Sequence, residues 1–430
     1  MKSVWQNIKP TEFKPLKEDI KTDILIIGGG IAGILCAAKL HEMGADYILI
    51  EKDRICSKTT ANTTAKITAQ HSLIYNDIIK KYGLNYAKAY LEANLEAIDY
   101  FEQEAKNIDC DFCYSDSFVY SKNNQMKIIK EVQAVKRLGF EADFVCDMPI
   151  PIKTLGAIRF ARQAHFHPLK FLYHISKNLN IYENTKALEF LPYGVKTEHG
   201  IIKAKKIIIT THFPLINKHG LYPIKMHQHR SYCIALSGAD KIHGMYLDED
   251  KKGLSFRPYG DLLLLGGGSH RTGKKGGGYT ELSEFAKKHF KNAKEVYRFA
   301  TQDCMTLDSI AYIGQYSKNT PDLYVATGFN KWGMTTSKVA ADIICDLLYV
   351  KANKYDKIFS PSRSILHPEL LINAFETSAN LIRPTTPRCP HLGCALKYNR
   401  EEHSWDCTCH GSRFSENGTL LEGPATDDLK

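Results

Sequence analysis

The sequence has no long hydrophobic run among its 430 residues. No apolar stretch reaches the roughly 20 residues that a bilayer-spanning helix requires, and residues 1–20 are polar and charged, unlike a signal peptide. The chain also lacks internal repeats, basic blocks and RNA-binding signatures, although its formal charge is +10. These absences predict a globular cytoplasmic protein without membrane or nucleic-acid partners. The positive charge is then expected to come from lysines dispersed over the surface.

Regular cysteine spacing is also scarce. Twelve cysteines are spread from Cys36 to Cys409, and only the last four are regularly spaced, whereas a secreted disulfide scaffold is short and densely paired. Most are expected to be reduced thiols in the core. Cys110 and Cys113 have C-x-x-C spacing without a second ligand pair, which favours a structural role over a redox or metal site.

A dinucleotide fingerprint lies near the N-terminus. An apolar strand at residues 25–27 runs into Gly28-Gly29-Gly30-Ile31-Ala32-Gly33, a helix is expected at 34–41, and a strand at 47–50 ends before Glu51. Gly28 permits the tight turn, Gly30 lets a pyrophosphate approach, and Gly33 allows close helix packing. Glu51 would hold ribose hydroxyls. The alternative is a glycine-rich turn without a nucleotide.

Further elements are expected along the chain. The pattern predicts helices at 87–107, 168–178 and 337–349, strands near 187 and at 206–210, and a strand-turn-strand unit between 232 and 268 with residues 257–261 as its turn. Segments 360–364 and 383–387 are typical of a linker.

Two boxes near the C-terminus carry the most specific signal. They read Cys389-Pro390-His391-Leu392-Gly393-Cys394 and Cys407-Thr408-Cys409-His410-Gly411-Ser412. Two cysteines and two histidines also suit tetrahedral zinc, but zinc does not explain Cys394 and Cys409 at these offsets. The boxes resemble the Rieske pattern, which implies a 2Fe-2S cluster with Cys389 and Cys407 on one iron and His391 and His410 on the other, and a disulfide between Cys394 and Cys409.

The module departs from that pattern in two ways. Only about 38 residues separate the helix expected at 337–349 from Cys389, so the domain is abbreviated, and its shielding is expected from the rest of the chain or from another subunit. Phe414 stands where high-potential Rieske proteins have a tyrosine near a cluster cysteine, which predicts a lower potential.

The first 350 or so residues resemble the D-amino-acid oxidase and glycine oxidase family of flavoproteins. The resemblance rests on the fingerprint, on Thr210-Thr211-His212-Phe213-Pro214 and on the Gly-containing loop of residues 326–335. It implies FAD, with contacts at Gly28, Gly30, Ile31, Ala32, Gly33, Glu51, Lys52, Thr63, Thr64, Ala65, Lys66, Ala187, Thr211, Gly328, Gly333, Met334 and Thr335. For residues 63–66, a helix entry with capping threonines is the alternative. The chain has one fingerprint, so NADH is not the expected electron source.

The implied fold is α/β: a Rossmann-like FAD-binding domain interleaved with an antiparallel-sheet substrate domain, followed by a small all-β Rieske module. The expected FAD-binding domain comprises residues 20–85, 150–222 and 303–352, and the substrate domain residues 86–149 and 223–302. A linker is expected at 353–384 and the Rieske module at 385–430.

The resemblance implies that the protein is an FAD-dependent oxidoreductase that oxidises an amine or amino acid and relays single electrons through the cluster. The expected partners are a small-molecule substrate and a one-electron redox protein. A reductase fed by a ferredoxin-like donor and a non-catalytic carrier or redox sensor stay open, whereas a Rieske oxygenase would need a further iron site. The sequence does not identify the catalytic residues. Arg230, Arg257 and Arg271 are candidates to bind a substrate carboxylate. No role is assigned to five histidines: His165, His167, His227, His229 and His270. Oligomeric state is not predicted.

Overall fold

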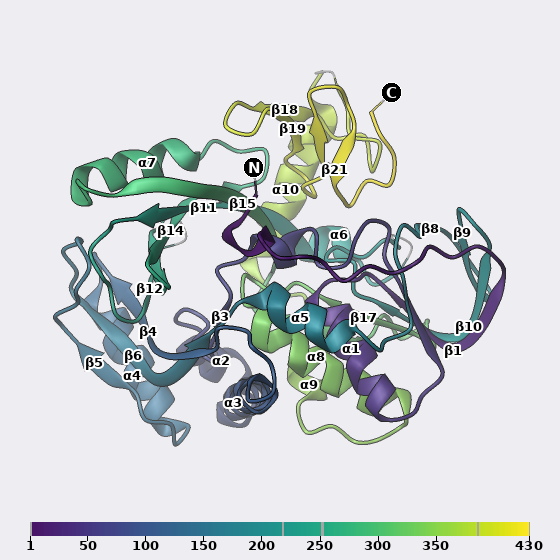
Figure 1. Ribbon diagram of the computed structural model, residues 1–430, viewed down its shortest axis with the longest axis horizontal. Coiled ribbons are helices and arrows are strands. Elements are labelled where there is room, and N and C mark those ends of the chain that lie inside the picture. The colour runs from purple at the N-terminus through teal and green to yellow at the C-terminus, as the bar shows by residue number, and fades with distance from the viewer. Residues whose placement is uncertain (1, 217–218, 251–252, 385–386, 430) are drawn as a thin grey trace.

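The structure is a computed structural model that describes residues 2–216, 219–250, 253–384 and 387–429. Three sheets organise the chain, and the predicted α/β class with a small all-β C-terminal module is confirmed (Figure 1). The predicted start of that module, residue 385, and part of the 383–387 linker segment lie outside the described residues.

The first sheet carries the fingerprint. Its central strands β1, β2, β7, β10 and β17 are parallel, whereas β16 and β9 pair antiparallel at their edges. Its strands are β1 (Ile20–Ile27), β2 (Tyr47–Ile50), β7 (Ile181–Tyr182), β8 (Ala187–Leu191), β9 (Gly194–Thr197), β10 (Ile201–Ile209), β16 (Tyr312–Gln315) and β17 (Leu323–Thr327). Strand β2 and the last residues of β1 and β10 are apolar and buried, as expected where both faces of a parallel sheet are covered.

Helices α1 (Ile31–Glu42) and α8 (Gly333–Leu348) pack on each other and on this sheet. The first half of α1 is rich in small residues and almost wholly buried, so the helix approaches the sheet and α8 closely. The predicted βαβ unit is confirmed, with α1 starting three residues before the expected position 34.

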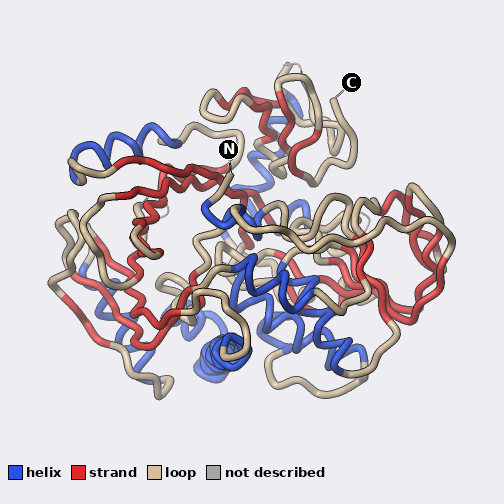
Figure 2. The backbone as a smooth tube through the Cα atoms, in the orientation of Figure 1, coloured by secondary structure: helices blue, strands red, loops and turns tan. Residues whose placement is uncertain are grey.

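The second sheet is mainly antiparallel and forms the left half of the molecule in Figure 2. Its strands are β3 (Lys66–Ile67), β4 (Cys113–Ser121), β5 (Asp143–Val145), β6 (Gly156–His165), β11 (Met226–Ser237), β12 (Met245–Asp248), β13 (Ser255–Tyr259), β14 (Leu262–Arg271) and β15 (Lys294–Thr306). Strands β3 and β6 fall within segments predicted for the FAD-binding domain, but they pair with each other in this second sheet.

Two local predictions are corrected. Residues 257–259 were expected in a turn but belong to β13, and only Gly260 and Asp261 separate it from β14. Residues 353–384 were expected to be a linker but contain α9 (Asp356–Phe359) and α10 (Pro368–Ile382). The Pro and Ser residues at 360–364 therefore separate two helices.

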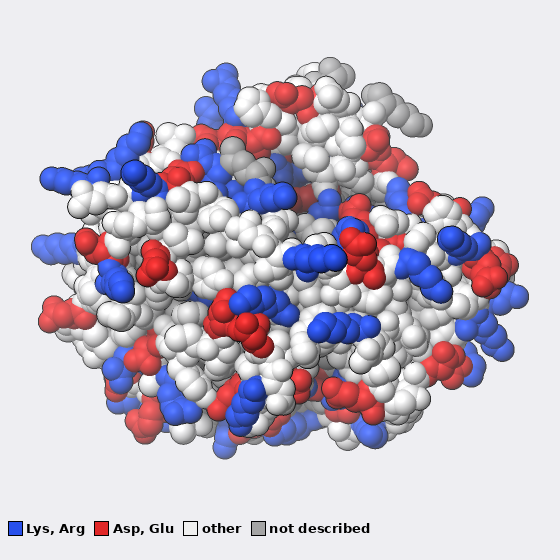
Figure 3. Space-filling view, viewed as in Figure 1, with Lys and Arg blue, Asp and Glu red and all other residues white. Residues whose placement is uncertain are grey.

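The remaining helices cover the sheets. They are α2 (Tyr75–Tyr82), α3 (Leu84–Ala105), α4 (Gln125–Arg137), α5 (Pro168–Ser176), α6 (Tyr222–Lys225) and α7 (Gly278–His289), with 3-10 turns at Val4–Gln6 and Thr59–Asn62. Among the described residues, no helix combines the length and hydropathy needed to span a bilayer. On the face shown in Figure 3, positive and negative side chains are interspersed.

The third sheet follows the first cysteine box and is antiparallel throughout. Its strands are β18 (Leu396–Asn399), β19 (Ser404–Cys407), β20 (Arg413–Ser415) and β21 (Leu420–Glu422). This small module sits on the body at the top of Figure 1, above β15 and beside α10. Its position brings the two boxes close to the body.

Candidate FAD and iron-sulfur sites

One cavity of about 910 Å³ runs between the three sheets. Its wall contains the ends of β1, β2, β10 and β17, parts of β11 and β15, and residues of the C-terminal module. Of the expected FAD contacts, those that line it are Gly28, Gly30, Ile31, Ala32, Glu51, Lys52, Thr63, Thr64, Lys66, Ala187, Thr211, Gly328, Gly333 and Met334. Gly33, Ala65 and Thr335 lie behind the wall.

The fingerprint glycines have three different environments. Gly28 has φ +113°, and a Cβ there would lie 2.7 Å from the carbonyl oxygen of Thr210. At Gly33, a Cβ would lie 1.9 Å from the carbonyl oxygen of Gly28, so this glycine permits close packing of α1 on the turn. A Cβ at Gly30 would meet only Thr60, at 3.4 Å, which leaves the cavity side open to a phosphate.

Glu51 closes the turn from the end of β2. Its carboxylate accepts hydrogen bonds from the backbone N–H groups of Gly29 (2.7 Å) and Asp53 (3.0 Å). Burial raises the pKa of Glu51, although the two N–H groups act to lower it. Glu51 lines the cavity beside Lys52, where its carboxylate would accept hydrogen bonds from ribose hydroxyls.

Thr63, Thr64 and Lys66 also line the cavity. Trp5 Nε1 donates to the carbonyl of Thr63 (2.7 Å), and Lys66 Nζ donates to the carbonyl of Tyr246 (3.3 Å). Burial, together with Arg257, lowers the pKa of Lys66 to about 7. Lys66 begins β3 and is not in a helix, so the alternative of an ordinary helix entry is not met.

The N-terminus of α8 also faces the cavity, through Gly333 and Met334. The partial positive charge of a helix N-terminus would stabilise negative charge on a bound flavin ring. Thr335 instead donates to the carbonyl of Thr68 (3.2 Å) and lies 3.1 Å from His71 Nε2. It therefore positions the helix rather than lining the wall.

His71 was missed by the sequence reading. Its Nε2 lies 2.9 Å from the carbonyl of Thr68 and its Nδ1 lies 2.6 Å from the hydroxyl of Tyr90, so Nε2 carries the proton. Burial lowers the pKa of His71 to about 3, and its ring stacks on Trp332 at 4.9 Å. Both rings line the cavity. No local motif identifies His71, whereas Trp332 lies in the Gly-containing loop of residues 326–335.

The two boxes bring the four predicted ligand side chains together in two pairs. The Cys389 and Cys407 thiols are neighbours, and the rings of His391 and His410 lie 5.1 Å apart. Burial lowers the pKa of His391 to about 4 and that of His410 to about 3, which favours the neutral imidazole that binds metal. This pairing of two buried thiols and two neutral imidazoles fits a 2Fe-2S cluster. Cys394 and Cys409 form a disulfide between the two loops.

The body shields this site. Phe213, which follows β10, lies with its ring 6.4 Å from the rings of both His391 and His410. Gln302 on β15 donates from Nε2 to the carbonyl of Gly411 (2.8 Å). Phe213 and Gln302 also line the large cavity, so the cluster loops contact the wall of the FAD site.

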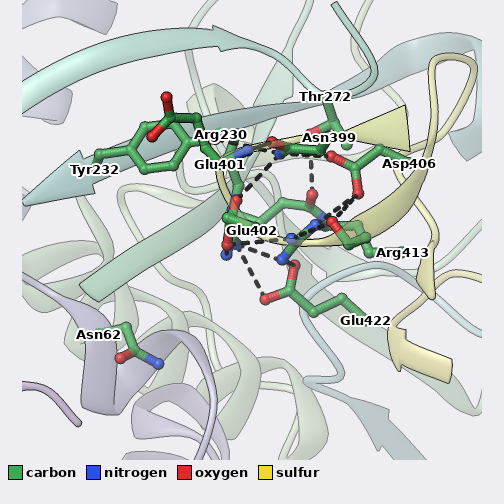
Figure 4. A network of polar contacts seen from close by, with 12 residues as sticks. Asn62, Arg230, Tyr232, Thr272, Asn399, Glu401, Glu402, Asp406, Arg413 and Glu422 are labelled. Atoms are coloured by element: carbon green, nitrogen blue, oxygen red, sulfur yellow. Dashed lines mark hydrogen bonds and ion pairs between the residues drawn. The ribbon is translucent and has the colours of Figure 1, made fainter. Parts of the chain in front are cut away.

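A buried ion network holds the module in place (Figure 4). Arg230 on β11 binds Glu402 through Nε (2.7 Å) and Glu422 through Nη1 (3.1 Å). Arg413 binds Asp406 (3.0 Å) and completes the cluster of charges. Arg230 and Arg413 are each 3% exposed.

Family models match almost the whole chain. Residues 23–347 match the model described as FAD dependent oxidoreductase, and residues 363–430 match the Rieske [2Fe-2S] domain. The chain is a member of this FAD-dependent oxidoreductase family. The oxidoreductase binds FAD in its larger part and a 2Fe-2S cluster in its Rieske domain, as predicted. The Rieske match includes α10, within the stretch that was expected to be a linker.

The oxidoreductase is similar to one protein over nearly its entire length. It is 37% identical to the putative Rieske 2Fe-2S iron-sulfur protein YhfW of Bacillus subtilis, across 97% of this chain and 94% of that protein. Among solved structures, glycine oxidase from Geobacillus kaustophilus has a TM-score of 0.68 at 16% identity, covering 80% of this chain and 99% of its own. L-proline dehydrogenase from P. horikoshii has a TM-score of 0.67 at 18% identity, covering 80% and 98%. These likenesses show the fold.

Proposed function

We propose that this oxidoreductase oxidises a small amine or amino acid at FAD and passes the electrons singly through the Rieske cluster to a one-electron redox protein. The observation that supports the relay is that Phe213 and Gln302 each belong to the cavity wall and each contact the cluster loops. A bound FAD accepts two electrons, whereas the cluster accepts one. The contacts of Phe213 and Gln302 supply a packed path between them.

The substrate class is supported by similarity to glycine oxidase and L-proline dehydrogenase, whose names denote amino acids. For this chemistry the residues around the flavin mainly hold the substrate in position. We extend the proposal to a cytoplasmic setting, in keeping with the mostly free thiols of the chain.

Three arginines were candidates to bind a substrate carboxylate, and none of them lines the cavity. Arg230 binds Glu402 and Glu422, and Arg271 binds Asn373 (2.9 Å). Arg257 is fully buried and lies over the ring of Trp5. Lys66 on β3, which was expected to contact FAD, lines the cavity, and we assign it to an anionic group of the substrate rather than to the cofactor.

The proposal is tested by anaerobic addition of amines and amino acids to the purified holoprotein. Bleaching of the flavin absorbance followed by the Rieske electron paramagnetic resonance signal would support it. If reduced ferredoxin fills the cluster first and the flavin second, and no amine bleaches the flavin, the protein is a reductase. If neither cofactor responds to any substrate, a carrier or sensor role remains.

A further inference from the structure

The wall of the FAD cavity is not built by the flavoprotein body alone. Eight residues of the Rieske domain line the same cavity as the fingerprint: Leu420, Leu421, Glu422, Gly423, Pro424, Ala425, Thr426 and Asp428. They comprise β21 and the segment after it. We define residues 420–426 as the tail segment.

The tail segment is fixed to the body at both ends. At one end Glu422 is bound by Arg230 of β11 (3.1 Å). At the other end Lys186 Nζ donates to the carbonyl of Thr426 (2.9 Å). Lys186 directly precedes Ala187, which is expected to contact adenine, so this end of the segment lies on the adenosine side. At the other end, Arg230 of β11 lies opposite Gln302 of β15. The segment therefore extends along the cavity from the side of β15 to the adenosine side.

The tail segment is also tied to the cluster. The backbone N–H of Ala425 donates to Ser412 Oγ (2.9 Å). Ser412 closes the second box and hydrogen-bonds to the Cys389 thiol. Ala425 packs in the same buried group as Cys389 and Cys407. The segment therefore joins the core around the cluster to the wall of the FAD cavity, and Ala425 belongs to both.

We propose that the tail segment is an FAD-binding element contributed by the Rieske domain, so that the cofactor is enclosed between the two domains. The domain then has a second role besides electron transfer, which is to retain FAD. This inference concerns binding of the cofactor and does not depend on the substrate or on the direction of electron flow, so it can fail while the proposed function holds.

The first test places a charge on the cavity side of the segment. Leu420 packs against the cysteine core, and Leu421 is the next residue of β21, so its side chain lies on the opposite face of the strand. In the holoprotein, Leu421→Asp should release FAD roughly tenfold more readily, measured by flavin fluorescence during dilution. Leu421→Met should retain FAD like the wild type. The matched control is Leu371→Asp, because Leu371 on α10 is 75% exposed and does not line the cavity.

A second variant covers the case in which Leu421→Asp also loses the cluster. Lys186→Met removes the hydrogen bond to Thr426 and keeps the apolar stem of the side chain. It should increase FAD release severalfold with the Rieske signal intact, while Lys196→Met, at the exposed position of β9, should not. If the first variant keeps its cluster and its FAD, the proposal is overturned. It is likewise overturned if that variant loses the cluster and Lys186→Met retains FAD like Lys196→Met.

Discussion

Phe213 packs against His410 with their ring centroids 6.4 Å apart, and it makes the same contact with His391. Phe213 is 3% exposed and follows Thr210 and Thr211, next to the fingerprint turn. A residue of the cavity wall, Phe213, therefore covers the histidine side of the cluster site.

Replacing Phe213 should slow electron exchange between the cofactors. Phe213→Leu keeps an apolar side chain and removes the ring that fills the gap between the cavity and the histidines. Phe213→Ala is less suitable, because it would cost about 3–5 kcal/mol of stability. We expect Phe213→Leu to reduce the rate from flavin to cluster severalfold in stopped-flow measurements, with both midpoint potentials unchanged. An unaltered rate would show that electrons take another route.

Lys66 should give substrate binding a pH dependence. Only its ammonium form attracts an anion, and its pKa is lowered to about 7 by burial and by Arg257. KM for a carboxylate-bearing substrate should therefore rise as pH rises through about 7. Lys66→Met should raise KM roughly tenfold below that pH and remove the inflection.

Lys66→Arg is the control, since a guanidinium keeps its charge across this range. It should hold KM low above pH 7. An inflection near pH 7 that persists in Lys66→Met would assign the titration to another group.

Phe414 should set part of the cluster potential. It is fully buried on β20 in the same group as Cys389 and Cys407. A hydrogen bond from a tyrosine hydroxyl to a cluster sulfur stabilises the reduced state, and it contributes about 0.5–1.5 kcal/mol. Phe414→Tyr should therefore raise the midpoint potential by roughly 20–60 mV for one electron. A potentiometric titration with an unchanged or lower midpoint would contradict the proposed ligand geometry.

The ion network should make docking of the Rieske domain sensitive to acid. Burial acts to raise the pKa of Glu422, but Arg230 and Arg413 lower it from 4.5 to about 2. The lowered pKa means that Glu422 contributes stability above pH 4.5, and this contribution is lost as pH falls toward 2. The free energy of unfolding of Glu422→Gln should therefore depend less on pH across this range than that of the wild type.

Removing Arg230 should be more damaging. Arg230→Met leaves Glu402 and Glu422 buried without this partner, which should cost about 3–5 kcal/mol of stability. The double variant Arg230→Met with Glu422→Gln should recover part of that loss in denaturant unfolding. Strictly additive effects would show that the two side chains are not coupled.

The sequence predicted the features that depend on local spacing. The residues of the fingerprint lie within six positions, as do those of each cysteine box. The disulfide partners follow from the match of the two boxes to a specific pattern. The turn was predicted over residues 257–261 because Pro258 and Gly260 are both common in turns. Pairing of β13 with β14 extends the strand through Tyr259 and restricts the turn to Gly260 and Asp261. The roles of Phe213, Gln302 and the tail segment depend on contacts between segments far apart in the chain, which no local pattern contains.

The central claim is that FAD and the cluster exchange electrons inside one chain, and the most direct measurement is pulsed reduction of the flavin in anaerobic holoprotein. The account predicts that the flavin reoxidises as the cluster signal grows, at a rate that does not change with protein concentration. A rate proportional to protein concentration, or a reduced flavin beside a cluster that stays oxidised, would contradict it.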